Sequence, residues 1–253
     1  MAIWQDPRTT TDRSGGVNAA TIGVPTVARD AGLRSYMLSV YNYMASGVLL
    51  TGIVALLFAP YAQDVLISAN GRGLSGLGWI VTLAPLAFVM VMSFGINRLS
   101  TGALQALFWA FAAVMGLSMA SIFLVFTGAS VARVFFITAA MFGAASLYGY
   151  TTKADLTKMG SFLFMGLIGI IIASLVNLFI GSSAIQFAVS VIGVIVFTGL
   201  AAYDTQMIKE TYAENAGVEA NTKLAVFGAL SLYLSFINLF QMLLQLFGVA
   251  RDE

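Results

Sequence analysis

Long apolar runs, separated by short polar segments, dominate the pattern of hydrophobic and polar positions along this chain. Six stretches contain no charged residue: 35–63, 73–97, 99–132, 134–152, 159–203 and 224–250. Roughly 20 apolar residues in a helix cross a hydrocarbon core ~30 Å thick. Five stretches therefore supply one crossing each, whereas 159–203 is long enough for two.

The segment FIGSSA at 179–184 predicts a turn that divides the longest stretch, because it combines glycine with two serines. The pattern thus predicts seven transmembrane helices, at 36–58, 76–96, 103–126, 131–149, 161–180, 184–207 and 226–247. A transmembrane barrel would show alternating segments of ~10 residues instead. We expect an all-α polytopic membrane protein with one seven-helix domain over 35–250.

Residues 1–34 have a different pattern, polar and without a helical period. We expect a flexible cytoplasmic tail. It is not expected to be a signal peptide, since the apolar run that follows is longer than an h-region.

Composition supports the membrane assignment. The chain has 253 residues, of which 59% are hydrophobic and 9% charged, with a mean hydropathy of +0.92. A soluble domain carries about 25% charged residues. The expected partner is therefore the lipid bilayer, and a net charge of +1 without a basic cluster gives no reason to expect nucleic acid binding.

Charge in the flanking segments predicts the orientation, because Lys and Arg are enriched on the cytoplasmic side. With the N-terminus inside, nine basic residues are cytoplasmic: Arg8, Arg13, Arg29, Arg34, Arg98, Lys153, Lys158, Lys209 and Lys223. Three are outside: Arg72, Arg133 and Arg251. We expect a cytoplasmic N-terminus and, with seven crossings, a C-terminus on the other side.

The absence of His and Cys limits the chemistry. It excludes the usual zinc, haem and iron–sulfur ligand sets, disulfides, and nucleophile pairs that contain histidine. Any response to pH would need a carboxylate that titrates above its usual range. We therefore expect no enzyme and no cofactor.

Small residues recur at four-residue spacing in two of the predicted helices. They are Ala112, Gly116 and Ala120 in one helix, and Ala139 and Gly143 in another. Such spacing lets neighbouring backbones approach closely. We expect these residues to serve helix packing.

The seventh predicted helix carries a polar stripe, defined by Ser231, Ser235, Asn238, Gln241 and Gln245. These residues fall within an arc of about 120° at 100° per residue. Unpaired polar groups cost several kcal/mol in lipid. The stripe therefore predicts a central helix that faces either a narrow polar interior or hydrogen-bonding partners on other helices.

Asp204 and Arg98 are the candidate functional charges. If the sixth helix ends at Tyr203, Asp204 is merely interfacial. If water begins at Lys209, Asp204 lies five residues, roughly 7.5 Å, inside, where a carboxylate is costly and by default functional. Arg98 ends the second predicted helix, either as a cytoplasmic anchor or as an ionic partner of Asp204.

Four segments carry a family resemblance: GLAAYDTQMIK (199–209), LYLSFINLFQMLLQLFG (232–248), LYGYTTKADLTKMGSFL (147–163) and GLSMASIFLVFTGASVARVFFITAAMFG (116–143). Together they resemble the bacterial branch of the Bax inhibitor-1/YccA family, over roughly residues 30–250. The resemblance implies an inner-membrane protein in which six helices surround a central seventh. It also implies a passive, pH-sensitive calcium leak, gated by two aspartates and by an arginine that favours the closed state.

Two of these residues match the family pattern and one departs from it. Asp204 matches the aspartate of the sixth helix and Arg98 the arginine, whereas Ser235 stands where LYLDFINLF would place the second aspartate. Two adjacent carboxylates resist ionising together, and Asp204 beside a hydroxyl lacks that coupling. Calcium prefers six to eight oxygens, so Asp204 is expected to be a weak calcium ligand.

A second hypothesis is an interaction protein that transports nothing. Bacterial members of the family resemble modulators of a membrane-bound ATP-dependent protease. A polar cytoplasmic tail would suit docking to such a partner, and the missing aspartate favours this alternative.

Overall fold

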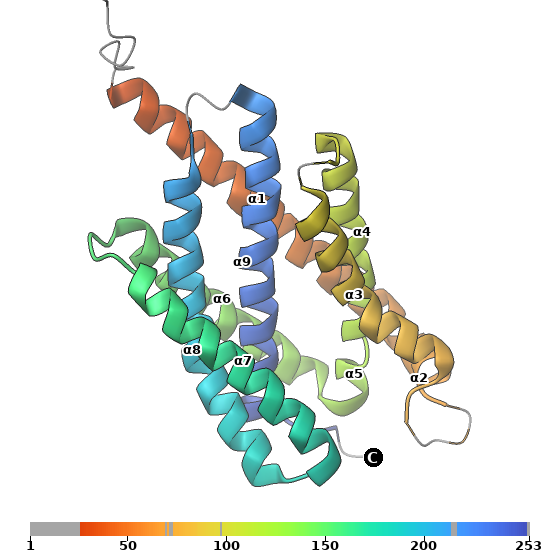
Figure 1. Ribbon diagram of the computed structural model, residues 1–253. Coiled ribbons are helices and arrows are strands. Elements are labelled where there is room, and N and C mark those ends of the chain that lie inside the picture. The colour runs from red at the N-terminus through yellow and green to blue at the C-terminus, as the bar shows by residue number, and fades with distance from the viewer. Residues whose placement is uncertain (1–25, 69, 71–72, 97, 214–216, 252–253) are drawn as a thin grey trace, which may run out of the picture.

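The computed structural model describes residues 26–251, apart from 69, 71–72, 97 and 214–216, and within this part of the chain every regular element is a helix (Figure 1). The elements are α1 (Thr26–Phe58), η2 (Ala59–Tyr61), α2 (Ala62–Leu66), α3 (Gly76–Gly95), α4 (Thr101–Met119), α5 (Ile122–Val125), α6 (Gly128–Thr151), α7 (Thr157–Ile180), α8 (Ser183–Thr211) and α9 (Gly217–Phe247). Seven helical segments are long and apolar enough to cross a membrane, which confirms the predicted fold class.

Several helices extend beyond the predicted spans. α1 already begins at Thr26, inside the segment expected to be a tail, while 1–25 lies outside the described residues. α9 begins nine residues before position 226, where Lys223 and Glu219 form an ion pair of 3.1 Å one helical turn apart. A hydropathy pattern ends where charges begin, but the helical hydrogen bonds continue beyond that point.

Two chain reversals show how short polar signals end helices. Gly181 adopts a left-handed conformation (φ 66°), and the Ser182 side chain accepts a hydrogen bond from the Ile185 amide, so the turn predicted at 179–184 is confirmed. The span predicted at 103–126, by contrast, is divided between α4 and α5 at Ala120 and Ser121.

α9 is the central helix (Figure 1). In its most apolar window 72% of the residues are buried, against 11–33% in the other six spans. α8, α1, α6 and α4 pack directly against α9, while α7 packs outside α8 and α3 outside α4. The six helices that surround the seventh therefore form two shells.

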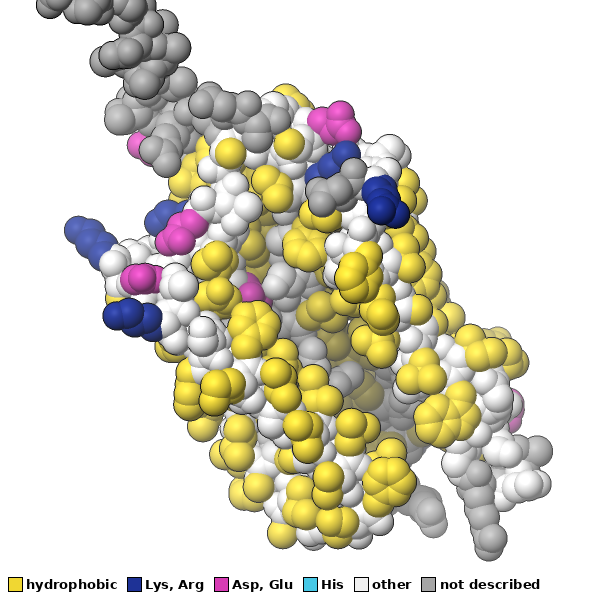
Figure 2. Space-filling view, viewed as in Figure 1, with side chains coloured by type: hydrophobic (Ala, Val, Ile, Leu, Met, Phe, Trp, Pro, Cys, Tyr) yellow, Lys and Arg dark blue, Asp and Glu magenta, His cyan; other side chains and the backbone are white. Residues whose placement is uncertain are grey.

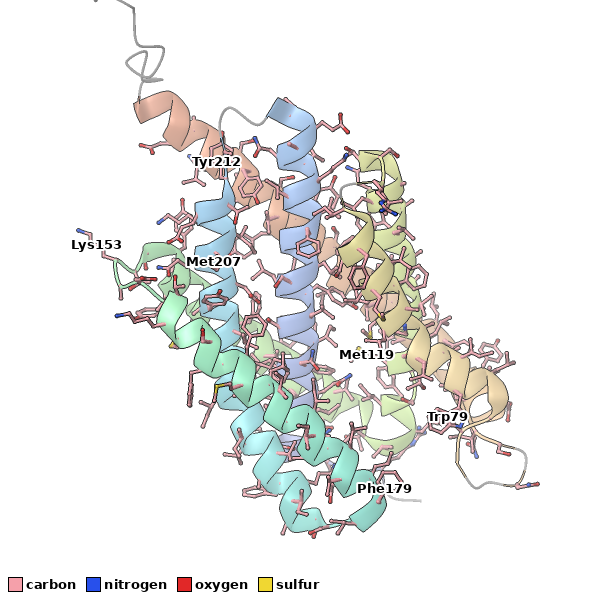
Figure 3. The ribbon with its side chains drawn as sticks, viewed as in Figure 1. Trp79, Met119, Lys153, Phe179, Met207 and Tyr212 are labelled. Carbon is pink, nitrogen blue, oxygen red and sulfur yellow. The ribbon has the colours of Figure 1, made fainter. Side chains whose placement is uncertain are left out.

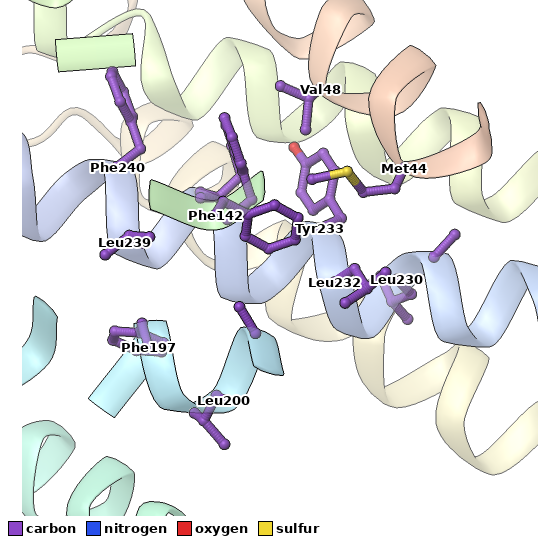
Figure 4. Close-up of a cluster of buried hydrophobic side chains, with 14 of the residues drawn as sticks. Met44, Val48, Phe142, Phe197, Leu200, Leu230, Leu232, Tyr233, Leu239 and Phe240 are labelled. Atoms are coloured by element: carbon purple, nitrogen blue, oxygen red, sulfur yellow. The ribbon is translucent and has the colours of Figure 1, made fainter. Parts of the chain in front are cut away.

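Aromatic side chains fill the contact between α9, α1 and α4. Tyr233 of α9 is fully buried and points toward Met44 and Val48 of α1 (Figure 4). The rings of Phe108 and Phe111 from α4 meet it edge to face, with centroids 6.3 and 5.1 Å away. Edge-to-face pairs add to the packing energy, and they leave only the tyrosine hydroxyl in need of a polar partner.

That hydroxyl finds its partner on α1. The Tyr233 and Thr51 side-chain oxygens are 2.6 Å apart, and Thr51 donates in turn to the backbone carbonyl of Ala112 at 2.8 Å. A buried three-helix network is thereby satisfied, and α1, α4 and α9 are joined at mid-depth.

The two sets of small residues behave differently. Gly116 lets α4 approach α1 closely, because a Cβ there would lie 2.7 Å from the carbonyl oxygen of Thr51, and both Ala112 and Ala120 are fully buried. The packing expectation is wrong for Ala139 and Gly143. Ala139 is exposed, and a Cβ on Gly143 would meet no atom within 4 Å.

Basic side chains gather at one end of the bundle (Figure 2). This basic end carries the start of α1 and the α3–α4, α6–α7 and α8–α9 connections, and it is defined by Arg34, Arg98, Lys153, Lys158, Lys209 and Lys223. Only Arg133 and Arg251 of the described basic residues belong to the opposite end. Figure 3 accordingly shows Lys153 and Tyr212 toward one end, and Trp79 and Phe179 toward the other.

Candidate functional site at the α8–α9 contact

Three consecutive polar residues of α8 each contact a different part of the molecule. Asp204 contacts α9, Thr205 contacts α1, and Gln206 contacts the α6–α7 connection. Successive side chains on a helix point about 100° apart, so three neighbours in sequence can reach three directions. α8 does not end at Tyr203 but continues to Thr211, which places all three inside the helix.

Asp204 is half-buried and hydrogen-bonded to the central helix. The Ser235 hydroxyl donates to its Oδ2 at 2.8 Å, and Ser235 is itself buried. Ser231 lies one turn earlier on α9 and is half-buried. Sequence analysis named Asp204 and Ser235, and the fold brings these two residues together.

Thr205 and Gln206 are site residues that the sequence analysis missed. The Thr205 Oγ1 lies 3.3 Å from the Tyr41 hydroxyl of α1. The buried Gln206 side chain accepts from the Leu156 amide at 2.8 Å and donates to the Ala154 carbonyl at 2.9 Å. Their only signal in the sequence was three adjacent polar residues, DTQ, inside an otherwise apolar helix.

The depth of Asp204 in the bundle follows from the position of Lys209, the next basic residue along α8. The Lys209 ammonium donates to the carbonyl of Tyr150 at 2.9 Å and lies 5.0 Å above the centroid of the Tyr150 ring. Lys209 thus anchors the end of α8 to the end of α6. Asp204 lies five residues, roughly 7.5 Å, deeper along the helix axis.

The polar stripe of α9 contacts α8 through two of its residues, Ser235 and Gln245. Ser235 bonds Asp204, and ten residues further on Gln245 accepts from the Ser190 hydroxyl of α8 at 2.7 Å. Between them Asn238 donates to the Leu234 carbonyl of its own helix at 2.8 Å, and Gln241 is half-buried.

Arg98 lies on the α3–α4 connection, at the same end of the bundle as the site. Its side chain is exposed. Within the described part of the chain the one ion pair is Lys223–Glu219, so Arg98 makes no ion pair with Asp204.

The oxygens around Asp204 are few and mostly neutral. Among the described residues no group of three or more His, Cys, Asp or Glu side chains comes together to hold a metal ion. A cation at this position would meet one carboxylate and the hydroxyl of Ser235. That set falls short of the six to eight oxygens that calcium prefers, and it suits transient contact better than storage.

Comparison with known proteins assigns the whole bundle to one family. Residues 33–252 match the family model described as inhibitor of apoptosis-promoting Bax1. Inner membrane protein YbhL of Escherichia coli K12 is 49% identical over 229 residues, which cover 87% of this chain and 94% of YbhL. Uncharacterized proteins of Rickettsia prowazekii (48% identity, 88% of this chain and 93% of the relative) and Caulobacter vibrioides (47% identity, 88% and 92%) are similarly related.

Proposed function

We propose a function from one premise: this chain belongs to the Bax inhibitor family of membrane proteins. We place it in a bacterial inner membrane, as the name of the related YbhL indicates. There it acts as a passive cation leak, with calcium as the transported ion, along the contact between α8 and α9. The gate in this proposal is the Asp204–Ser235 pair.

The single observation that carries the proposal is the 2.8 Å hydrogen bond from Ser235 to Asp204. A carboxylate inside a spanning helix is costly, and its usual compensation is a partner together with a function. The serine hydroxyl and a cation compete for the same carboxylate oxygens. In the closed state the hydroxyl occupies them, and a passing cation displaces it.

The substitution of serine for a second carboxylate alters how such a gate responds to pH. Two facing carboxylates would share a proton near neutral pH, whereas one carboxylate beside a hydroxyl has no partner with which to share it. The proposed leak therefore depends weakly on pH and binds calcium weakly.

Arg98 enters the proposal as a charge at the entrance rather than as a contact of the gate. It is exposed on the α3–α4 connection, at the basic end of the bundle. Its charge lowers the local concentration of cations at that entrance. The same excess of basic residues leads us to orient the basic end, and with it the N-terminus, toward the cytoplasm.

Calcium entry into liposomes loaded with a calcium dye tests the proposal. Ser235→Ala removes the donor to Asp204, which is worth about 1.5–3 kcal/mol for a charged acceptor, so the open fraction should rise about 10–100-fold. Asp204→Asn should reduce the flux. Glu210→Gln is the matched control, because Glu210 is an exposed acid at the same end of α8. If Asp204→Asn and the control show the same calcium flux, Asp204 does not belong to a calcium pathway.

Ser235→Asp restores the paired carboxylates and gives a second test. The pair should make flux depend on pH between about 6 and 8, where a coupled carboxylate can titrate. A flat profile for this variant in a protein that does conduct calcium contradicts the proposed coupling.

The second candidate function is an interaction protein that modulates a membrane-bound ATP-dependent protease or another membrane complex. One observation favours it: Asp204, Thr205 and Gln206 are all occupied in holding other elements. Such residues can serve the fold alone. Affinity purification in mild detergent, with and without residues 1–25, distinguishes the two functions. The interaction function is supported if the protein shows no calcium flux and if a protease co-purifies with the full chain but not with the chain that lacks residues 1–25.

A further inference from the structure

A groove with a volume of about 770 Å³ runs between α1 and α6, and we call it the α1–α6 groove. Both helices pack against α9, but in the described chain they make no extensive contact with each other. Phe236 of α9 forms part of the floor. Leu38 and Leu147 line the groove and are 54% and 64% exposed, so it opens sideways to the surroundings of the bundle.

The deep end of the groove is apolar and continues further. Val48, Phe135 and Phe236 also line a second cavity of about 300 Å³, which extends between α1, α5, α6 and α9. The walls of this second cavity are almost entirely aliphatic and aromatic side chains. A hydrocarbon chain fits such surroundings, because a cavity lined by apolar side chains holds no ordered water that the chain would have to displace.

The other end of the groove carries one acid and one base. Asp30 and Arg34 lie one turn apart on α1, both line the groove, and both are exposed. No ion pair joins them in the part of the chain that the structure describes. An arginine pairs well with a phosphate, and a carboxylate pairs well with an ammonium group.

Between these ends lies a buried hydroxyl without a partner. Ser146 lines the groove and is only 4% exposed, and its Oγ makes no hydrogen bond within the described structure. Unpaired buried hydroxyls are uncommon and call for an explanation. Ser146 precedes Tyr150, at the mouth, by four residues, so it lies roughly 6 Å deeper along α6.

The part of the groove below Arg34 matches one leaflet in length. The α1 wall runs from Asp30 to Val48, 18 residues or about 27 Å at 1.5 Å per residue, and the part from Arg34 to Val48 spans 14 residues, about 21 Å. Half of a bilayer, including its headgroup region, is about 20–22 Å thick.

From these features we propose that the α1–α6 groove binds one zwitterionic phospholipid with a primary ammonium headgroup, of the phosphatidylethanolamine type. The phosphate lies at Arg34 and the ammonium group at Asp30. Ser146 donates to an ester oxygen, and one acyl chain runs over Phe236 toward Val48. Lipid pockets between transmembrane helices commonly place basic residues at the headgroup. Here the neighbouring acid selects against lipids with net negative charge.

Native mass spectrometry of the full-length, delipidated protein titrated with phosphatidylethanolamine or phosphatidylglycerol tests this proposal. We expect one phosphatidylethanolamine per protein, bound more tightly than phosphatidylglycerol. Gly143→Leu fills the groove without a clash, because a Cβ there meets nothing within 4 Å. It should weaken binding by at least about tenfold, the equivalent of two buried methylenes. Gly169→Leu on the exposed surface of α7, also free of contacts, is the matched control and should change nothing.

The headgroup variants make the assignment specific. Arg34→Gln should weaken the binding of both lipids about tenfold or more, as expected for a lost bond to a charged group. Asp30→Asn should remove the preference for phosphatidylethanolamine. Equal binding to Gly143→Leu and Gly169→Leu overturns the site. If Asp30→Asn still prefers phosphatidylethanolamine to phosphatidylglycerol, the headgroup assignment is overturned. A third outcome also overturns the lipid site. If neither the wild type nor Gly143→Leu binds lipid, and a second protein co-purifies with the wild type but not with Gly143→Leu, the groove holds a partner helix instead.

Discussion

The contact between α6 and α8 depends on Gly149, and replacing it with alanine is the sharpest test of the packing. A Cβ at this position would overlap the backbone carbonyl oxygen of Ala202 and lie 2.8 Å from its carbonyl carbon. Ala202 is two residues before Asp204, so a displacement of α8 here also disturbs the bond to Ser235.

Two effects of opposite sign set the magnitude. In a helix alanine is up to about 1 kcal/mol more favourable than glycine. Against this, the carbonyl oxygen of Ala202 is the limiting contact, since it would lie closer to the new Cβ than the carbonyl carbon does, so the two backbones must separate by more than about 1 Å. Overpacking of this kind costs about 1–3 kcal/mol. Gly143→Ala in the same helix has the more favourable helix propensity of alanine without overpacking, because its Cβ meets nothing within 4 Å.

The assay is thermal unfolding of the two purified variants in the same detergent. Gly143→Ala should be as stable as the wild type or slightly more stable, and Gly149→Ala should be less stable than Gly143→Ala by about 1–3 kcal/mol. At about 2–4 °C per kcal/mol, the midpoints should differ by roughly 2–12 °C. If Gly149→Ala melts at or above Gly143→Ala, the close approach of α6 and α8 is refuted.

Three further predictions concern the polar contacts. Tyr233→Phe removes the bond to Thr51 and should lower the free energy of unfolding by about 0.5–2 kcal/mol, measured by the same melts; no loss would mean that this buried network adds nothing. Gln206→Leu leaves two backbone groups of the α6–α7 connection unpaired, so limited trypsin digestion should cut that connection faster than in the wild type, and an unchanged rate contradicts the assigned role. The Thr157 hydroxyl, together with the Thr157 amide that donates to Asp155 at 2.9 Å, holds the pKa of that carboxyl below its usual range. A lowered pKa stabilises the fold above the usual carboxyl pKa of about 4, and this contribution is lost as the pH falls through the folded value. Asp155→Asn should therefore melt slightly lower than the wild type at pH 7, and the difference should shrink as the pH is lowered below about 4. A difference that stays the same as the pH is lowered would mean that the charge is not responsible.

Much of the architecture follows from local properties of the sequence. The number of spanning helices and the turn at Gly181 depend only on the summed hydropathy of neighbouring residues and on one glycine conformation. The central position of α9 was predictable as well, because a polar stripe in a charge-free helix needs partners. The helix ends were not predictable to better than ten residues at the start of α1. Hydropathy records where the apolar surface ends, but backbone hydrogen bonds continue past that point.

Within the site, the sequence by itself determined which polar residues would have to be satisfied, while the tertiary structure decided which groups satisfy them. Asp204 and Ser235 were both identifiable, but Thr205 and Gln206 find partners 164 and 50 residues away. The same holds for Gly143 and Gly149, which have equal local propensities and lie on the same helix. One faces an open groove and the other the backbone of α8, because the rotation and separation of packed helices depend on all of their contacts together.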